Sequence, residues 1–434
     1  MKKERKKRAI SSYLVSTTIL FRFIMNSMNR LFFRIVRKNV LSNLAILFLF
    51  SNCVHTVKNI ENDGIRTIEI VSNIRNPQIV KLSEVALSID YCMLETDKKC
   101  LIRNKSIYNS GEYFVYMSWD ACYVFERKTG AFIRQISQIG QGPNDYQYAG
   151  RVLNGDKGQI FMIGNNQYLF FNIDGTLSHK TKVFASHIFA YENLYVRYVP
   201  NTMGNSTNRI AFHDSKTGEI IDSIPNSRFY KSAEGRSYSY GNDFSFHTFN
   251  NFLFYKDIYC DTLYQIKDFS LQPRYIFNTG GRTVPYESQI EGRADIQAMI
   301  AGRENDRYAK YIVVNSFFES TNFLLFTFDN RNMKYPVVYH KSEDKLHIMP
   351  SIPIPLLYLR DGKMPLFGLE NDMDGGLPFW PDQMISENEM MCVYTAEELL
   401  ELDRSKITDE KLKNVLNSLD IESNPVVAIV TLKN

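Results

Sequence analysis

The 434-residue sequence has few cysteines, and their spacing excludes two common kinds of site. The six are Cys53, Cys92, Cys100, Cys122, Cys260 and Cys392, and no two of them have the CxxC spacing. The sequence therefore indicates neither a zinc site nor a thioredoxin-type redox motif. Without Cys53 the count is odd, so at least one thiol lacks a partner within the chain. Cys92 and Cys100 could form a disulfide or remain separate thiols.

Common catalytic motifs are missing as well. The sequence contains no HExxH, GxSxG, Walker A or GxGxxG pattern. These patterns mark zinc proteases, α/β-hydrolases, P-loop NTPases and dinucleotide-binding domains, so the usual forms of those classes are excluded. The seven histidines are dispersed along the chain and form no motif.

An excess of positive charge is confined to the N-terminus. Residues 1–52 hold eleven lysines and arginines and one acid, Glu4. The rest of the chain has 40 basic and 46 acidic residues, so its body is mildly acidic. Nucleic-acid binding needs a basic footprint, and the body lacks one.

The strongest apolar run, residues 40–50, is too short to span a bilayer, which takes about 20 helical residues. It follows the basic segment 28–39 and precedes small polar residues. This order is typical of a signal peptide, which we assign to residues 1–52. The alternatives are a signal anchor and an ordinary secretory signal. A second basic-then-apolar segment lies in front, so Met25 or Met28 is a candidate for the true start.

The sequence LFSNC, residues 49–53, resembles a lipobox of the loose kind found in Bacteroidetes, although Asn52 stands where the strict pattern has Gly or Ala. The resemblance implies cleavage before Cys53 and a lipid on its sulfur. Residues 53–65 would then form a lipidated tether. We expect a cell-envelope protein anchored through this lipid, in the outer membrane.

Short β-runs separated by turn residues dominate the rest of the chain. In each unit, apolar and polar residues alternate on both sides of a turn, as in a β-hairpin. Five such units occupy residues 121–136, 159–183, 208–225, 252–277 and 322–340. Repeated short antiparallel strands predict an all-β fold, a β-propeller with four-stranded blades around a channel.

Few helices are expected. In residues 394–403, Thr395 and Glu398 are placed as a capping box. Residues 408–420 have an apolar stripe on one face, which predicts a helix packed on the body. Residues 287–313 form a polar, arginine-rich insertion. No long linker follows residue 65, so residues 66–434 are expected to form one domain.

Residues 137–150, SQIGQGPNDYQYAG, contain two glycines and a proline between β-runs. We interpret them as a crossover from the outer strand of one blade to the innermost strand of the next. Gly140 and Gly142 would permit backbone angles closed to other residues, and Pro143 would fix φ. Tyr146 would lay its ring over the junction.

The segment GQGPNDY resembles the GrGPGEY signature of six-bladed β-propeller lipoproteins of Bacteroidetes, relatives of NHL-repeat propellers. Residues 80–102, 371–381 and 424–434 are similar to that family's opening strands, late NDxDGG loop and closing strand. Asn144 and Asp145 replace Gly and Glu of the signature, and Asp145 keeps the charge. The resemblance implies six blades and an envelope location, without an assigned reaction. A propeller must also join its ends, so we expect residues 424–433 to pair with a strand within 66–95.

Metal-binding candidates are weak, and no cofactor is indicated. His187, His213 and His247 lie in different expected blades and could converge near the channel, where NHL-type lyases hold metal and substrate. Histidines on strands or turns are the plainer interpretation. Asp372 and Asp374 could contribute to a Ca²⁺ site, or Asp374 could cap the following glycine corner.

Ligand-contact candidates come from loops. Phe379 and Trp380 stand between prolines; exposed, they would form a platform for a sugar or a partner, and buried, a plug in the last blade. Arg282 could bind acidic ligands or belong to a self-compensated insertion. Tyr146 is a further candidate.

The expected function is a lipid-anchored scaffold that binds a glycan, a peptide or an outer-membrane protein, because a propeller presents loops around a concave channel. Two alternatives remain open. One is a hydrolase or lyase with a metal held by channel His and Asp side chains. The other is a structural accessory of an outer-membrane uptake complex.

Overall fold

Residues 64–434 form one compact unit in the computed structural model. The described residues are 64–153, 159–164, 167–181, 188–201, 203–231, 243–286, 288, 307–354 and 365–433. The leader, the predicted lipidation site Cys53 and most of the polar insertion lie outside them. Among the described residues, no helix has the length and apolar character needed to cross a membrane.

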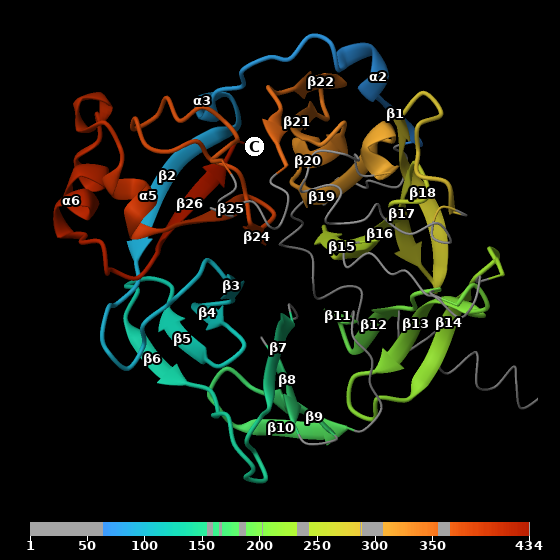
Figure 1. The fold of residues 1–434 in the computed structure, drawn as a ribbon, viewed down its shortest axis with the longest axis horizontal. Helices are drawn as coiled ribbons and strands as arrows, with labels where there is room; N and C mark the ends of the chain where they lie inside the picture. Colours follow the sequence, from blue (N-terminus) through green and yellow to red (C-terminus); the bar gives the residue numbers. More distant parts are fainter. Residues whose placement is uncertain are drawn as a thin grey trace, which may run out of the picture. The chain divides into compact units, whose positions relative to one another are not determined.

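Six sheets form a ring, the number that the family resemblance implies, and each blade runs from an inner strand at the axis to an outer strand (Figure 1). Blade 1 contains β3 (Ile107–Ser110), β4 (Tyr113–Met117), β5 (Cys122–Glu126) and β6 (Phe132–Gln135). Blade 2 contains β7 (Tyr148–Leu153), β8 (Gln159–Gly164), β9 (Gln167–Phe171) and β10 (Leu177–Thr181). Blade 3 contains β11 (Ile188–Tyr191), β12 (Leu194–Tyr198), β13 (Asn208–Asp214) and β14 (Ile220–Pro225).

Blades 4 and 5 each carry an additional strand. Blade 4 contains β15 (Phe244–Phe249), β16 (Phe252–Asp257), β17 (Thr262–Lys267) and β18 (Ser270–Asn278), and β1 (Arg66–Glu69) adds a parallel outer strand. Blade 5 contains β19 (Val313–Glu319), β20 (Phe323–Asn330), β21 (Met333–His340) and β22 (Lys345–Ile348), and β23 (Ile352–Pro353) pairs with β21.

Blade 6 closes the ring. It combines β24 (Gln383–Ser386), β25 (Glu389–Tyr394) and β26 (Val426–Leu432) from the C-terminus with β2 (Ala86–Met93) from the N-terminal part. Strand β26 pairs antiparallel with β2, from Ala86 opposite Leu432 to Met93 opposite Val426. The predicted joining of the two ends is therefore confirmed.

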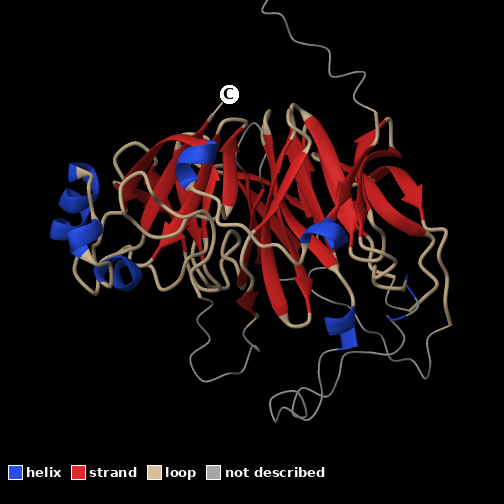
Figure 2. Cartoon of the chain, turned by 90° about the horizontal axis from the view of Figure 1, so that it is seen from above, coloured by secondary structure: helices blue, strands red, loops and turns tan. Residues whose placement is uncertain are grey.

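Neighbouring blades pack through apolar side chains that alternate along their strands. The interface between blades 1 and 2 buries Val115 and Val124 against Ile160 and Leu169, and Tyr146 from the crossover lies fully buried among them. Figure 2 shows the strands running between two faces of the ring, where the connecting turns gather. Each antiparallel blade therefore places the turn after its first strand and the turn after its third strand on the same face.

The β6–β7 crossover is present where predicted, but its glycines serve another purpose. Neither Gly140 nor Gly142 has a positive φ. Instead, an added Cβ would lie 2.1 Å from Asp145 Oδ2 at Gly140 and 2.7 Å at Gly142. The Asp145 carboxylate accepts the Gly142 N–H at 2.8 Å, so the glycines leave room for this carboxylate. The residue with a left-handed angle is Ser137, with φ of 55°.

The two expected helices are α5 (Ala396–Leu400) and α6 (Glu410–Ser418). Thr395 and Glu398 form the predicted capping box, and α6 buries Leu412 and Leu416. The described helices also include two single α-helical turns, α2 (Ile70–Asn73) and α3 (Leu82–Val85). Short 3₁₀ helices lie at Arg307–Lys310 and Arg404–Lys406.

Candidate functional site

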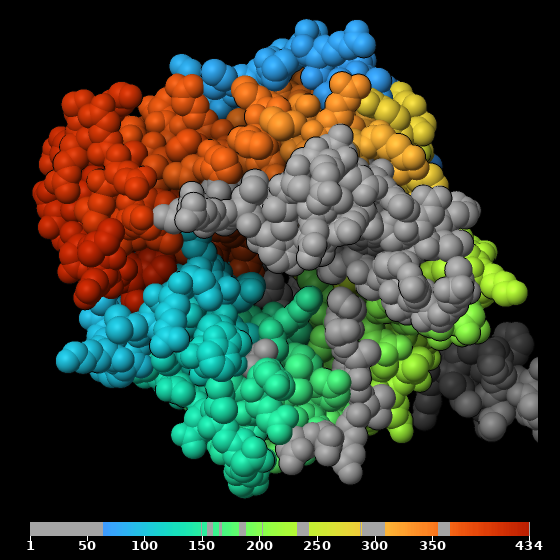
Figure 3. All heavy atoms as spheres, viewed as in Figure 1, coloured from blue at the N-terminus to red at the C-terminus, as the bar shows by residue number. Residues whose placement is uncertain are grey.

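A cavity of about 990 Å³ opens where the turns after the first strands meet around the axis. Four of these turns, at residues 110–112, 191–193, 249–251 and 386–388, belong to blades 1, 3, 4 and 6. We call this cavity the channel mouth. Its described lining residues are Asn109–Tyr113, Arg127, Ile173, Ala190–Glu192, Thr248–Asn251, Glu319, Gln383–Glu387 and Glu389. Figure 3 shows the blades as spheres in the same view along the axis as Figure 1.

The charged groups of the channel mouth are mostly carboxylates. Its described lining contains five glutamates and one arginine, Arg127. Arg127 Nη1 lies 3.9 Å from Glu389 Oε2, which partly offsets one of the five. Glu112, Glu192 and Glu387 form no ion pair with any described residue. Among the described residues, nothing neutralises these three carboxylates.

Asn109 lies in the same wall, at the contact between two blades. Its backbone N–H donates to Gln383 Oε1 at 2.8 Å, which joins inner strands β3 and β24 of adjacent blades. The residue is 9% exposed, and its Oδ1 atom has no hydrogen-bond partner among the described residues. A buried acceptor without a partner costs about 1–3 kcal/mol. The protein encloses this atom, so it does not form part of the cavity surface.

The fifth glutamate, Glu319, is already satisfied by protein groups. Lys341 Nζ donates to Glu319 Oε1 at 2.6 Å, Tyr275 donates its hydroxyl to the same atom at 3.0 Å, and His247 Nε2 lies 3.2 Å from Oε2. Burial by itself would raise the pKa of Glu319, but Lys341 and His247 lower it to about 2. Glu319 is therefore an ionised structural group that ties β19 to β15, to β18 and to Lys341, which follows β21.

The metal-binding candidates do not converge. His213 is buried, with Nδ1 2.8 Å from the Gly218 carbonyl oxygen within its own blade, and His247 contacts Glu319. His187 lies outside the described residues. Across the described ranges, no group of three or more His, Cys, Asp or Glu side chains is arranged to hold a metal ion.

Asp372 and Asp374 stabilise local structure. Asp372 accepts the Ser83 N–H at 2.9 Å and its hydroxyl at 2.6 Å. Asp374 accepts the Tyr91 hydroxyl at 2.7 Å and the Gly376 N–H at 2.8 Å, so it caps the glycine corner. Burial raises the pKa of Tyr91, and the carboxylate of Asp374 raises it further. Cys92 and Cys100 are free thiols.

Of the two alternatives for Phe379 and Trp380, an exposed platform or a buried plug, the structure shows the buried one. Phe379 and Trp380 are 0% and 7% exposed and pack in the core of blades 5 and 6, and Tyr146 is fully buried. Their rings fill blade interfaces, so the buried alternative holds for Phe379 and Trp380, and Tyr146 is not exposed to a ligand. The exposed tryptophan is Trp119, 68% accessible in the β4–β5 turn. Arg282 is half-buried, and its Nε donates to the Thr279 carbonyl at 3.4 Å.

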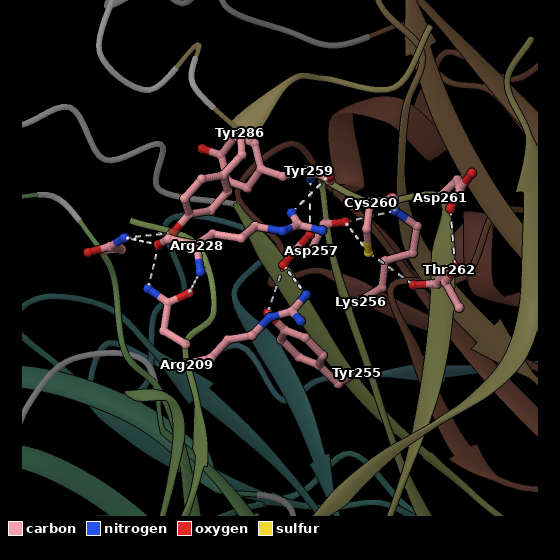
Figure 4. Close-up of polar contacts among 12 residues, drawn as sticks. Arg209, Arg228, Tyr255, Lys256, Asp257, Tyr259, Cys260, Asp261, Thr262 and Tyr286 are labelled. Atoms are coloured by element: carbon pink, nitrogen blue, oxygen red, sulfur yellow. Dashed lines mark hydrogen bonds and ion pairs between the residues drawn. The ribbon is translucent and has the colours of Figure 1, made fainter. Parts of the chain in front are cut away.

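A second polar cluster joins blades 3 and 4 at the opposite end of the strands (Figure 4). Arg209 on β13 forms an ion pair with the buried Asp257 at the end of β16, and its Nε donates to the Tyr255 hydroxyl at 3.2 Å. Lys256 Nζ donates to the carbonyls of Asp257 and Cys260, each at 2.8 Å. Burial lowers the pKa of Lys256. These groups satisfy one another's hydrogen-bonding capacity and hold blades 3 and 4 together.

Little space is left in this cluster for a ligand. Arg228 lies with its guanidinium 5.3 Å from the Tyr286 ring centroid and donates to the Tyr259 carbonyl at 3.2 Å. The adjoining cavity measures about 10 Å³, which is close to the volume needed for one water molecule. The channel mouth is therefore the better candidate for a ligand site.

Sequence reasoning missed the channel-mouth residues. Glu112, Glu192 and Glu387 follow the ends of the inner strands β3, β11 and β24, so their positions carry a signal: in a propeller, such turns lie beside the axis. The position of these glutamates beside the axis can be inferred from the sequence only after the inner strand of each blade has been identified.

Comparisons with known proteins agree with this fold. A family model, described as "Domain of unknown function (DUF4934)", matches residues 65–431. A search of curated proteins gives no match.

Two solved structures match the chain to different extents. A protein of Bacteroides fragilis NCTC 9343 that is named as an exported protein has a TM-score of 0.59 at 18% identity, covering 86% of this chain and 100% of that chain. The extracellular domain of a one-component system from B. thetaiotaomicron has a TM-score of 0.33 at 11% identity, covering 62% of this chain and 30% of that one. The first of these shows a shared fold. Because the family model spans most of the sequence, the chain belongs to the family described as Domain of unknown function (DUF4934).

Proposed function

We propose that this protein is a lipid-anchored scaffold of the cell envelope that binds a ligand in its channel mouth. One observation supports this most strongly: a cavity of about 990 Å³ opens at the ring axis and is lined by turns of four blades. Ligand sites are typically concave and largely preformed, with a few polar groups that fix orientation. Glu112, Glu192 and Glu387, which form no ion pair with a described residue, are polar groups of this kind.

The proposed location rests on the leader. A basic segment, a short apolar run and LFSNC precede the propeller, and they support lipidation of Cys53 after removal of residues 1–52. We place the mature protein in the outer membrane of a member of the Bacteroidetes, among propeller lipoproteins related to NHL-repeat proteins. The exported name of the B. fragilis protein with the same fold is consistent with an envelope location.

Lipidation predicts a specific labelling result. Cells that express the wild type and are fed radiolabelled palmitate should yield a labelled, membrane-bound protein, because the thioether lipid requires the Cys53 sulfur. The Cys53→Ala variant should incorporate no label. Equal labelling of both proteins would place the anchor elsewhere.

Binding in the channel mouth predicts that blocking the cavity removes ligand-induced stabilisation. Thr248 is an exposed lining residue on the inner strand β15, so Thr248→Trp should obstruct the cavity. Gln272→Trp, on the outer strand β18 and likewise exposed, introduces the same side chain away from it. A panel of amines, oligosaccharides and short peptides is tested by thermal shift, since a ligand that binds only the folded state raises Tm.

We expect at least one compound to raise the Tm of the wild type and of Gln272→Trp but not of Thr248→Trp. A compound that stabilises all three proteins equally binds elsewhere. A result in which every stabilising compound behaves that way would contradict binding in the channel mouth.

A further inference from the structure

Three exposed apolar side chains lie at one outer corner of the ring. Ile220 and Ile221 are more than half exposed at the start of β14, directly after the β13–β14 turn, and Phe269 is 39% exposed in the β17–β18 turn. Both turns follow the third strand of a blade, so they lie on the same face as the channel mouth. We call these three residues the apolar corner. It occupies the outer parts of blades 3 and 4, which are neighbours in the ring (Figure 1).

A ring contact fixes the apolar corner across the two blades. The rings of Phe269 on blade 4 and Phe212 on blade 3 meet edge to face, with centroids 4.9 Å apart. Phe212 is buried on β13, in the hairpin that leads to Ile220. Exposed apolar residues that occur singly are normal, but neighbours held at fixed positions form a patch that gains free energy when a partner covers it.

The described chain begins beside this corner. Strand β1 pairs in parallel with β18, from Arg66 opposite Tyr275 to Glu69 opposite Asn278. Since β18 begins at the β17–β18 turn, the start of β1 is directed toward the face that contains the channel mouth. Ile65, the residue before β1, is more than half exposed. The propeller is therefore entered at the outer edge of blade 4, on the side of Phe269.

The length of the predicted tether limits which surface can reach the membrane. Residues 54–64 separate Cys53, which carries the proposed lipid, from Ile65. A segment of that length spans at most about 36–40 Å when fully extended. A globular domain of the size of this propeller is roughly 50 Å across. The tether therefore favours membrane contact by surfaces close to Ile65 over those on the far side of the ring, and the apolar corner is such a surface.

The charges at the corner do not favour a partner of either sign. The two turns hold Lys216 and Lys267 but also Glu219 and Asp268, and all four are exposed. Because the signs balance, a strongly charged partner would gain little. A lipid surface, in contrast, takes isoleucine and phenylalanine side chains into the boundary between its headgroups and acyl chains.

We propose that the apolar corner docks on the lipid surface to which the protein is anchored, with Ile220, Ile221 and Phe269 inserted at the headgroup–acyl boundary. This docking rests on the lipidation of Cys53 proposed above, and it adds an orientation: blades 3 and 4 touch the membrane. Since the contact lies at the outer edge of two blades, the channel mouth at the axis stays open to a ligand.

The test uses the mature full-length protein, purified in detergent and reconstituted into vesicles of phosphatidylethanolamine and phosphatidylglycerol with plain or brominated acyl chains. Bromine quenches tryptophan that reaches the acyl region. The chain has two tryptophans, Trp380, which is buried, and Trp119, which is exposed in the β4–β5 turn on the opposite face. Trp119→Phe combined with Phe269→Trp moves the exposed reporter to the apolar corner. Trp119→Phe combined with Ile221→Trp supplies a second corner reporter.

Two proteins serve as controls. The wild type keeps its exposed reporter at Trp119, and Trp119→Phe alone gives the emission of the buried Trp380, which is subtracted. We expect brominated vesicles to lower the emission of both corner reporters about twofold, because side chains of docked surfaces lie about 5–10 Å into the boundary. The emission of Trp119 in the wild type should change little.

Flotation of the same samples with the vesicles separates the docking from the anchor. If the protein floats but neither corner reporter is quenched, the anchor stands and the docking is refuted. Equal quenching of Trp119 and the corner reporters would show that the ring has no preferred face, which also refutes it. A blue shift of the corner reporters that grows with protein concentration in detergent, without quenching by brominated lipid, would assign the corner to a second copy of the chain instead. A protein that does not float would overturn the anchor and the docking together.

Discussion

Deletion of residues 424–434 is expected to abolish cooperative folding of the propeller. The deleted segment contains β26, which pairs with β2 on one side and β25 on the other, so its loss splits blade 6 and opens the ring. Five of its seven residues are buried. Each buried Val or Leu contributes about 1.5–3 kcal/mol, and a whole domain is stable by only about 5–15 kcal/mol.

Loss of Asn424 adds to this effect. Its side-chain amide donates to the carbonyls of Glu95 and Cys100, at 2.6 and 2.9 Å, and so holds the chain that leads from blade 6 into blade 1. Circular dichroism during heating should show no cooperative transition for the deletion variant. Ile421→Ser is the control, because this side chain is 66% exposed just before the segment, and it should shift stability by no more than about 0.5 kcal/mol. A deletion variant with the melting curve of the wild type would refute closure by β26.

The sequence was sufficient to predict the ring because the relevant signals are local or terminal. Alternation along each hairpin identifies its strands, and the capping box at Thr395 identifies a helix start. The closing strand follows from geometry, since a propeller must join its ends. The role of the crossover glycines could not be predicted in this way. The close approach of the Asp145 carboxylate to Gly140 depends on the folded turn, and φ is unrelated to it.

The candidate site could not be predicted from the sequence because its residues come together only in the folded ring. Asn109 and Gln383 are 274 residues apart and meet only because the ring closes. A glutamate on a turn usually indicates a solvated surface, and nothing local distinguishes Glu112 or Glu387 from that case. Conversely, Trp380 stands between prolines in a loop-like segment, yet tertiary packing buries it. Only the assembled blades show which turns surround the channel mouth.

Glu319→Gln is expected to destabilise the propeller by about 3–5 kcal/mol, because it leaves the buried ammonium of Lys341 without its counter-ion. The side chains of Glu319 and Lys341 are 0% and 9% exposed, so water cannot replace the lost partner. Urea denaturation should show a lower midpoint with an unchanged slope. Glu410→Gln is the matched control: its carboxylate forms an exposed ion pair with Lys413, and such pairs contribute no more than about 1 kcal/mol.

The double variant Glu319→Gln with Lys341→Met tests whether the loss of stability in Glu319→Gln comes from the unpaired charge of Lys341. Removing both charges avoids an unpaired ion in the core, so stability should recover most of the loss seen in Glu319→Gln alone. If the double variant is as unstable as the single one, the damage comes from another contact of Glu319, such as its hydrogen bond from Tyr275.

Lowering the pH should remove the stabilisation by the Glu319–Lys341 ion pair without any mutation. Folding lowers the pKa of Glu319 from its ordinary 4.5 to about 2, so the native state favours the ionised carboxylate. The stability from this group is fully present above the unfolded pKa and is lost as the pH falls toward 2, because the unfolded chain takes up the proton first. Between pH 5 and pH 2, the wild type should therefore lose more stability than the Glu319→Gln, Lys341→Met double variant. Equal losses in urea titrations across that range would show that Glu319 is not held ionised by Lys341 and His247.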